Sequence, residues 1–136
     1  MQTEEVDTII IGGGLSGIYA AFLLAARAKS LALLEARSRL GGRILSPEHQ
    51  GFFLIWAHPG IGPCSTQYQD GAKEEFTATE YDQRAAHNHP EFQPPSGKTS
   101  IWDGMLHFAG SETADHFGGH LEGALASAER AVSAAI

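Results

Sequence analysis

The sequence predicts an α/β fold, in which helices pack on a parallel β-sheet. Two apolar runs, at residues 6–11 and 31–34, have the length and composition of short strands. Between them, the alanine-rich residues 16–29 show the three- and four-residue apolar spacing of a helix. A strand, a helix and a second strand in this order form a right-handed βαβ unit, so the fold is predicted to be Rossmann-like.

The first run is β-branched and alternates little between apolar and polar residues. This pattern is typical of a parallel strand buried on both faces, so we expect it in the middle of a covered sheet. In the following helix, the apolar positions that recur at helical spacing are Ile18, Ala21, Phe22 and Ala25. They form the face expected to pack on the sheet.

The glycines between strand and helix match the spacing G-x-G-x-x-G as Gly12, Gly14 and Gly17. These positions suit a tight turn, a close approach of backbone to a pyrophosphate, and close packing of helix on strand. Ser16 lies in the same turn, and Glu35 follows the second strand at the distance expected of a ribose-binding acid. The motif alone serves NAD as well as FAD, and a tight turn without a ligand is the alternative.

Composition limits the possible functions. The chain of 136 residues is the size of one domain, so we expect a single domain over 1–136. Its net charge of −7, with nine Lys and Arg, argues against a nucleic-acid partner. The single cysteine, Cys64, excludes an internal disulfide, and no targeting or membrane-spanning pattern is present, which favours the cytoplasm.

Residues 35–43 read E-A-R-S-R-L-G-G-R, and this segment resembles the flavin-containing amine oxidases, the family of monoamine and polyamine oxidases. The resemblance implies that Glu35 holds the adenosine ribose of FAD. It places Arg37, Gly42 and Arg43 along the ribityl and phosphate path, where an arginine fork can neutralise a diphosphate. An exposed basic loop is the alternative.

The middle of the chain, residues 44–101, contains all six prolines and is expected to be irregular. His87 and His89 could be two metal ligands, but no further ligands complete a site, so we expect no bound metal. No functional role is assigned to this segment.

The last segment, residues 102–136, begins with an expected short strand at 106–109 and a turn at 110–113. A final helix follows, expected to pack on the sheet beside the βαβ unit, with Glu129 and Arg130 facing solvent. Its apolar face is formed by Leu121, Leu125, Ala128, Val132 and Ala135.

Residues 106–131 resemble the C-terminal signature of the same family, F-A-G-[ST]-E-T, G-x-x-E-G-A and A-x-E-R-A. The resemblance places Gly110 and Ser111 on the FAD phosphates or ribityl chain, and the start of the last helix at the pyrimidine edge of the flavin. His120 stands where monoamine oxidases have tyrosine, so an intact aromatic cage for the amine is not supported; a histidine bonded to backbone is the alternative. The residues expected near the flavin ring are Gly119, His120, Leu121 and Ala124.

The resemblance covers residues 6–43 and 102–132, which the family separates by a long substrate-binding region that this chain lacks. It implies an FAD-dependent oxidation of amines with dioxygen as acceptor, giving hydrogen peroxide. No catalytic residue is identified. A binding module for FAD or its ADP half, or a self-associating remnant, are the alternatives. Uncovered apolar sheet surface also predicts a homodimer.

Overall fold

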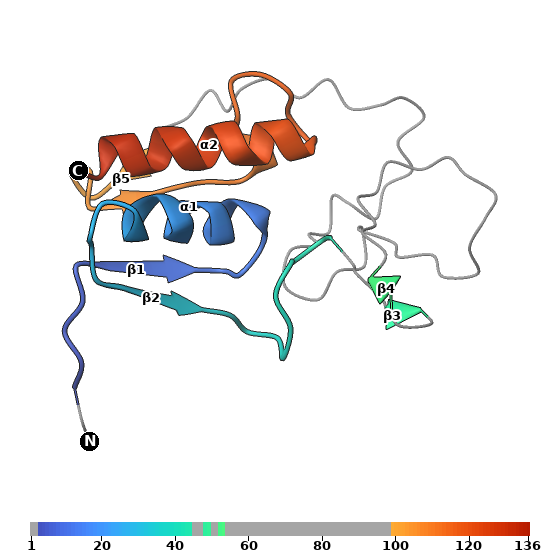
Figure 1. Ribbon diagram of the computed structural model, residues 1–136. Coiled ribbons are helices and arrows are strands. Elements are labelled where there is room, and N and C mark those ends of the chain that lie inside the picture. The colour runs from blue at the N-terminus through green and yellow to red at the C-terminus, as the bar shows by residue number, and fades with distance from the viewer. Residues whose placement is uncertain (1–2, 45–47, 50–51, 54–98) are drawn as a thin grey trace. The chain divides into compact units, whose positions relative to one another are not determined.

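The computed structural model describes residues 3–44, 48–49, 52–53 and 99–136 (Figure 1). The chain divides into two compact units. The first consists of Met1–Gly42 with Phe92–Ile136, and the second of Arg43–Glu91. In the second unit, β3 (Glu48–His49) pairs antiparallel with β4 (Phe52–Phe53). In the middle segment that we expect to be irregular, residues 45–47, 50–51 and 54–98, with His87 and His89, lie outside the described residues. The single domain over 1–136 stays a prediction.

The first unit contains the expected βαβ arrangement, which confirms the Rossmann-like prediction. It is made of β1 (Thr8–Ile11), α1 (Leu15–Ala25) and β2 (Leu31–Leu34). The two strands are parallel and in register from Thr8 opposite Leu31 to Ile11 opposite Leu34. Asp7 fixes the start of the pair, because its carboxylate accepts hydrogen bonds from the backbone N–H and the hydroxyl of Ser30, at 2.9 and 2.7 Å.

The C-terminal segment adds a hairpin, a short 3-10 turn and a long helix. β5 (Ser100–Ile101) pairs antiparallel with β6 (Leu106–His107), so the expected strand at 106–109 is shorter than predicted and belongs to its own small sheet. The turn η3 (Ser111–Thr113) leads into α2 (Leu121–Ala134). α2 lies beside the βαβ unit, as predicted.

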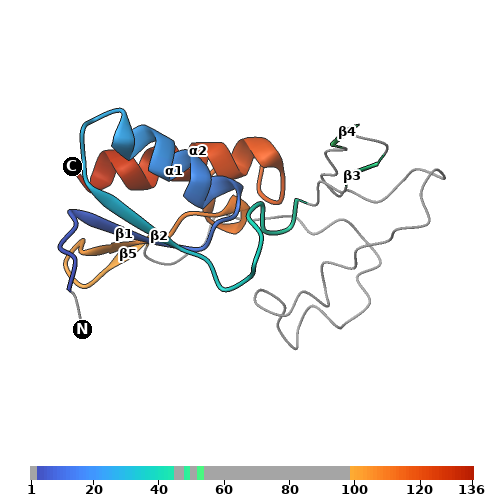
Figure 2. The same cartoon turned by 60° about the horizontal axis from the view of Figure 1, so that its bottom comes forward.

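α1 and α2 pack against each other, and both lie on the same side of β1 and β2 (Figures 1 and 2). α2 packs against α1, and Ile10 of β1 and Leu31 of β2 pack against the cluster that contains Ala128 and Val132 of α2. The hydrophobic core lies between the two helices and the sheet. It consists of Ala20, Leu24, Ala128 and Val132, packed by Ile10, Tyr19, Leu23 and Leu31.

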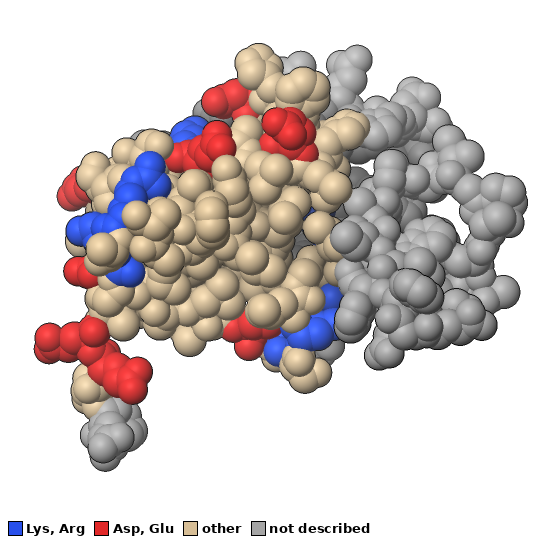
Figure 3. Space-filling model, in the orientation of Figure 1, with Lys and Arg blue, Asp and Glu red and all other residues tan. Residues whose placement is uncertain are grey.

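The buried face of α1 differs from the predicted one. Ala20 and Leu24 are buried, whereas Phe22 is 66% exposed and Ile18 38% exposed. The reason is that α1 contacts the sheet on one side and α2 on another, so small residues fill the narrow space between them. Figure 3 shows the result, a broad uncharged surface over α1 with the charged side chains at its margins.

The sheet is covered on one face, so the expectation of a strand buried on both faces is wrong. Ile10 packs into the core beneath α1, but Ile9 and Ile11 are 60% and 83% exposed. Leu34, opposite Ile11 in the register, is 55% exposed. Within the described part of the chain, no helix packs on this face, because α1 and α2 both lie on the other side of the strands (Figure 2).

The buried face of α2 also differs in part from the predicted one. Ala128 and Val132 are buried as expected, but Leu121 and Ala135 are exposed. The small residues Gly123, Ala124, Ser127 and Ala131 complete the buried side. Within the described ranges, no helix is both long and apolar enough to cross a bilayer.

Glu129 is exposed, as expected, whereas Arg130 is half-buried, and both side chains make hydrogen bonds. The hydroxyl of Tyr19 donates a 2.8 Å hydrogen bond to Glu129 Oε1, which ties α1 to α2 and raises the pKa of Tyr19. Arg130 Nη2 donates to the carbonyl oxygens of Phe108 and Thr113, at 3.2 and 3.0 Å, and to the Thr113 hydroxyl at 3.1 Å. These contacts tie the segment around η3 to α2.

Candidate functional site

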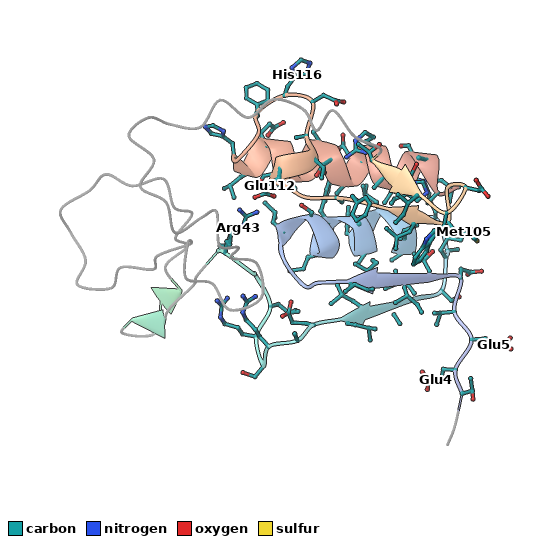
Figure 4. All side chains as sticks on the ribbon, turned by 180° about the vertical axis from the view of Figure 1, so that it is seen from behind. Glu4, Glu5, Arg43, Met105, Glu112 and His116 are labelled. Atoms are coloured by element: carbon teal, nitrogen blue, oxygen red, sulfur yellow. The ribbon has the colours of Figure 1, made fainter. Side chains whose placement is uncertain are left out.

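The candidate site lies at the end of the first unit where β1 and β2 finish. α1 and α2 both begin at this end, because the two helices run parallel to each other and antiparallel to the strands (Figure 1). Carboxyl ends of parallel strands and helix N-termini are where α/β folds bind anionic ligands. The hairpin turn at Met105 lies at the opposite end (Figure 4).

The glycine turn between β1 and α1 has the conformation that its sequence predicts. Gly12 has a φ of +103°, and its N–H donates to the carbonyl of Leu34 at 2.8 Å, which extends the strand pairing by one residue. A Cβ at Gly17 would overlap the carbonyl oxygen of Gly12. These two glycines therefore allow the tight turn and the close packing of helix on strand.

The N-terminus of α1 has no side-chain cap. Its N-cap is Gly14, no side chain accepts a hydrogen bond from the first turn, and the first turn contains no acidic residue. The N–H groups of this turn, with Ser16 among them, thus present the positive end of the helix dipole without an acidic residue in the helix's own first turn. Such an end suits a phosphate group.

Glu35 follows β2 and lies against the glycine turn. Its Oε2 accepts a 2.7 Å hydrogen bond from the Gly13 N–H, and its Oε1 accepts one of 2.9 Å from the Arg37 N–H. The Arg37 guanidinium is 3.9 Å from Oε1, and the Glu35 side chain is 11% exposed. The Arg37 N–H first, then the Gly13 N–H, lower the pKa of Glu35, so the carboxylate is charged at neutral pH.

The segment after Glu35, residues 37–42, is called the strap below. Arg39 Nη1 donates to the carbonyl of Gly42 at 2.9 Å and closes the strap on itself. The Gly41 N–H donates to the carbonyl of Gly13 at 2.8 Å, and Gly41 forms a β-bridge with Gly14. The structure therefore brings Arg37 and Gly42 to the glycine turn. Arg43 belongs to the second unit, which is described separately.

The residues predicted from the C-terminal signature gather at the start of α2. Gly110 donates its N–H to Ser127 Oγ at 2.9 Å, and Ser111 is buried. The Gly119 N–H donates to the carbonyl of Ser111 at 3.3 Å. His120 is the N-cap of α2, with Nδ1 2.9 Å from the carbonyl oxygen of Gly118.

Two further residues predicted near the flavin begin α2. Leu121 is 44% exposed, whereas Ala124 is buried one turn further along. The exposed leucine is available to a ligand, but the buried alanine faces the protein. The structure thus assembles one group around the glycine turn and another around the start of α2, both at the same end of the unit (Figure 1).

Sequence reasoning missed four residues that shape the site. Gly13 and Gly41 join the strap to the turn, and Ser127 and Arg130 hold the segment around η3 on α2. The signal for Ser127 is a polar residue within an alanine-rich helix face, where a buried hydroxyl needs a partner. Arg130 is part of the motif A-x-E-R-A, but its position in that motif does not indicate which backbone groups it bonds.

Comparisons with known proteins support a Rossmann-like dinucleotide-binding unit. A family model described as an NAD(P)-binding Rossmann-like domain matches residues 10–60. Putrescine oxidase of Kocuria rosea is 32% identical over 109 residues, covering 80% of this chain. The flavin-containing amine oxidase of Oncorhynchus mykiss is 48% identical over 69 residues, covering 50% of this chain and 13% of that protein. The chain is a partial relative of the flavin-containing amine oxidases.

This amine-oxidase-like chain spans 22% of the length of the Kocuria rosea relative. A solved structure of wild-type putrescine oxidase bound to putrescine is 39% identical, with a TM-score of 0.34 over 40% of this chain and 12% of that one. The resemblance predicted from the two motif segments is confirmed. Within the described ranges, no group of three or more His, Cys, Asp or Glu side chains is placed to hold a metal ion.

Proposed function

We propose that this chain binds FAD at the end of the first unit where β1 and β2 finish. The observation that carries the proposal is the uncapped N-terminus of α1 beside the Glu35 carboxylate. The N–H groups of the turn suit the diphosphate, while the carboxylate, with each oxygen accepting one backbone N–H, keeps lone pairs for ribose hydroxyls. The flavin-containing relatives support the choice of FAD over NAD.

The start of α2 is proposed to approach the pyrimidine edge of the flavin ring. Its N-terminus has no side-chain cap, so its first N–H groups can stabilise negative charge there. Glu122 in the first turn opposes this effect. Leu121 would supply an apolar contact because its side chain is partly exposed.

We propose oxidation of an amine as the reaction, for which bound FAD would supply the hydride acceptor and dioxygen the final oxidant, giving hydrogen peroxide. The names of the relatives support this reaction class. This chain's own residues bind and orient the cofactor, and no side chain of the described residues is assigned as a catalytic base. Binding of FAD without turnover is the second candidate, favoured by the short span relative to the relatives. The cytoplasm is the proposed location.

The deciding experiment is a titration of the purified protein with FAD, followed by flavin fluorescence and the visible spectrum. Saturable uptake of FAD, and weaker uptake of NADH, supports the proposal. A colourless protein that takes up no added FAD overturns it. Anaerobic mixing with a panel of primary amines and polyamines then separates the two candidates, because only turnover bleaches the flavin.

A further inference from the structure

The strap contacts the glycine turn through main-chain atoms rather than through side chains. The Gly41 N–H bonds the carbonyl of Gly13 at 2.8 Å, and Gly14 and Gly41 form a parallel bridge. Two glycine-rich segments more than twenty residues apart in sequence thus share one short ladder. Because both segments lack side chains here, their backbones approach closely.

Gly42 is the residue that permits this approach. Its φ is +60°, and a Cβ added there would lie 3.1 Å from the Cα of Gly14. That distance is tighter than ordinary contact, and the neighbouring atom is backbone, so the strap and the turn would have to separate. At Gly13 an added Cβ would meet the Cδ2 of Leu40 instead, and a flexible side chain can rotate away.

We propose that Gly42 is a positioning residue, which sets the place of Gly14 at the N-terminus of α1 and thereby the affinity for the diphosphate of the cofactor. This inference rests on the proposed binding of FAD, and it adds which residue positions the diphosphate-binding turn. Gly14 is the N-cap of α1, so a shift of its backbone displaces the N–H groups that receive the phosphates. Glu35 shares the displacement, because it bonds Gly13 and Arg37 together.

The test compares Gly42→Ala with the matched control Gly104→Ala. Gly104 also has positive φ, +85°, but an added Cβ there has open space within 4 Å. It adjoins Met105 at the end of the unit remote from the site (Figure 4). Both variants incur the left-handed backbone cost of alanine, so both are expected to lower the melting temperature, and Gly42→Ala the more because of its contact with Gly14.

In FAD titrations, Gly42→Ala is expected to raise the Kd about tenfold or more, because the binding groups tolerate only small displacements. Gly104→Ala is expected to leave the Kd unchanged. Equal Kd values for Gly42→Ala and wild type overturn the inference, as does an equal rise in both variants. Failure of wild type to bind FAD instead overturns the proposed function, so the two failures are distinguishable.

A second measurement uses the wild-type protein and needs no folded variant. Hydrogen exchange of the Gly41 amide reports the bond between strap and turn directly. Added FAD is expected to slow exchange at Gly41 together with the amides of the turn. If FAD slows the turn amides but leaves Gly41 exchange unchanged, the strap is not coupled to the ligand and the inference is wrong.

Discussion

The backbone N–H of Gly13 donates a 2.7 Å hydrogen bond to the Oε2 of Glu35, 22 residues later in the chain. This bond joins the turn after β1 to the residue that follows β2. The strand pairing makes it possible, because Ile11 lies opposite Leu34 and the chain leaves both strands at the same edge. The phosphate-binding turn and the candidate ribose-binding acid thus form one connected group.

Replacing Glu35 with glutamine tests this group. The amide keeps the size of the side chain but loses one acceptor oxygen and the charge, so one of the two N–H bonds is lost. We expect the Kd for FAD to rise about tenfold or more, since hydrogen bonds to a charged group contribute roughly 1.5–3 kcal/mol. The control is Glu5→Gln, on the extended segment before β1 (Figure 4). Unchanged affinity in Glu35→Gln would remove this residue from the ribose site.

Acid should destabilise the protein through two carboxylates whose pKa values are lowered. Hydrogen bonds from Ser30 lower the pKa of Asp7 from 3.8, and those from Arg37 and Gly13 lower that of Glu35 from 4.5. The folded state then binds fewer protons than the unfolded state, so the stabilisation is complete above the ordinary values and is lost as pH falls through the lowered ones. Urea denaturation at a series of pH values measures this, and Asp7→Asn should flatten the acid limb.

Gly17→Ala should disrupt the turn. The added methyl would overlap the carbonyl oxygen of Gly12, and neither backbone segment can yield without moving α1 off β1. Overpacking of this kind costs about 1–3 kcal/mol. We expect a lower urea midpoint together with loss of FAD binding. A variant with wild-type stability and affinity would show that α1 and β1 are less closely packed than the structure indicates.

Arg130→Met should loosen the segment around η3 from α2. The guanidinium bonds Phe108 and Thr113, and methionine preserves the aliphatic stem without donors. Loss of these bonds is expected to lower the free energy of unfolding by about 1–3 kcal/mol. Arg27→Met is the matched control, because Arg27, which follows α1, bonds the nearby carbonyl of Leu23. Equal effects of the two substitutions would contradict the anchoring role of Arg130.

The exposed face of the sheet is the surface through which we expect the homodimer predicted from the sequence to form. Ile9, Ile11 and Leu34 expose apolar side chains on one side of the strands, and association would remove them from water. Analytical ultracentrifugation at micromolar concentration should show a dimer, which Ile9→Thr with Ile11→Thr converts to monomer. Phe22→Ser, on α1, is the control for apolar surface elsewhere. A wild-type monomer with flavin bound would refute the prediction.

The sequence by itself determined the βαβ unit, the glycine turn and the place of Glu35 directly after the second strand. These features follow from short-range patterns, namely two apolar runs, a helical spacing between them and glycines at fixed offsets. It also predicted the final helix, since α2 has a continuous run of helix formers with small and apolar residues on one side. Local chemistry was sufficient for each of these elements.

The tertiary structure decided which faces are buried. Whether Phe22 or Leu24 points into the core depends on where α2 packs, and periodicity within α1 contains no information about a helix that begins about a hundred residues later. The same holds for Ile9 and Ile11, which are exposed because both helices lie on the other side of the strands. The contact of Gly42 with Gly14 is likewise long-range, because it requires two loops to meet in space. Since glycine has no side chain, its position in the sequence does not indicate which residue it contacts.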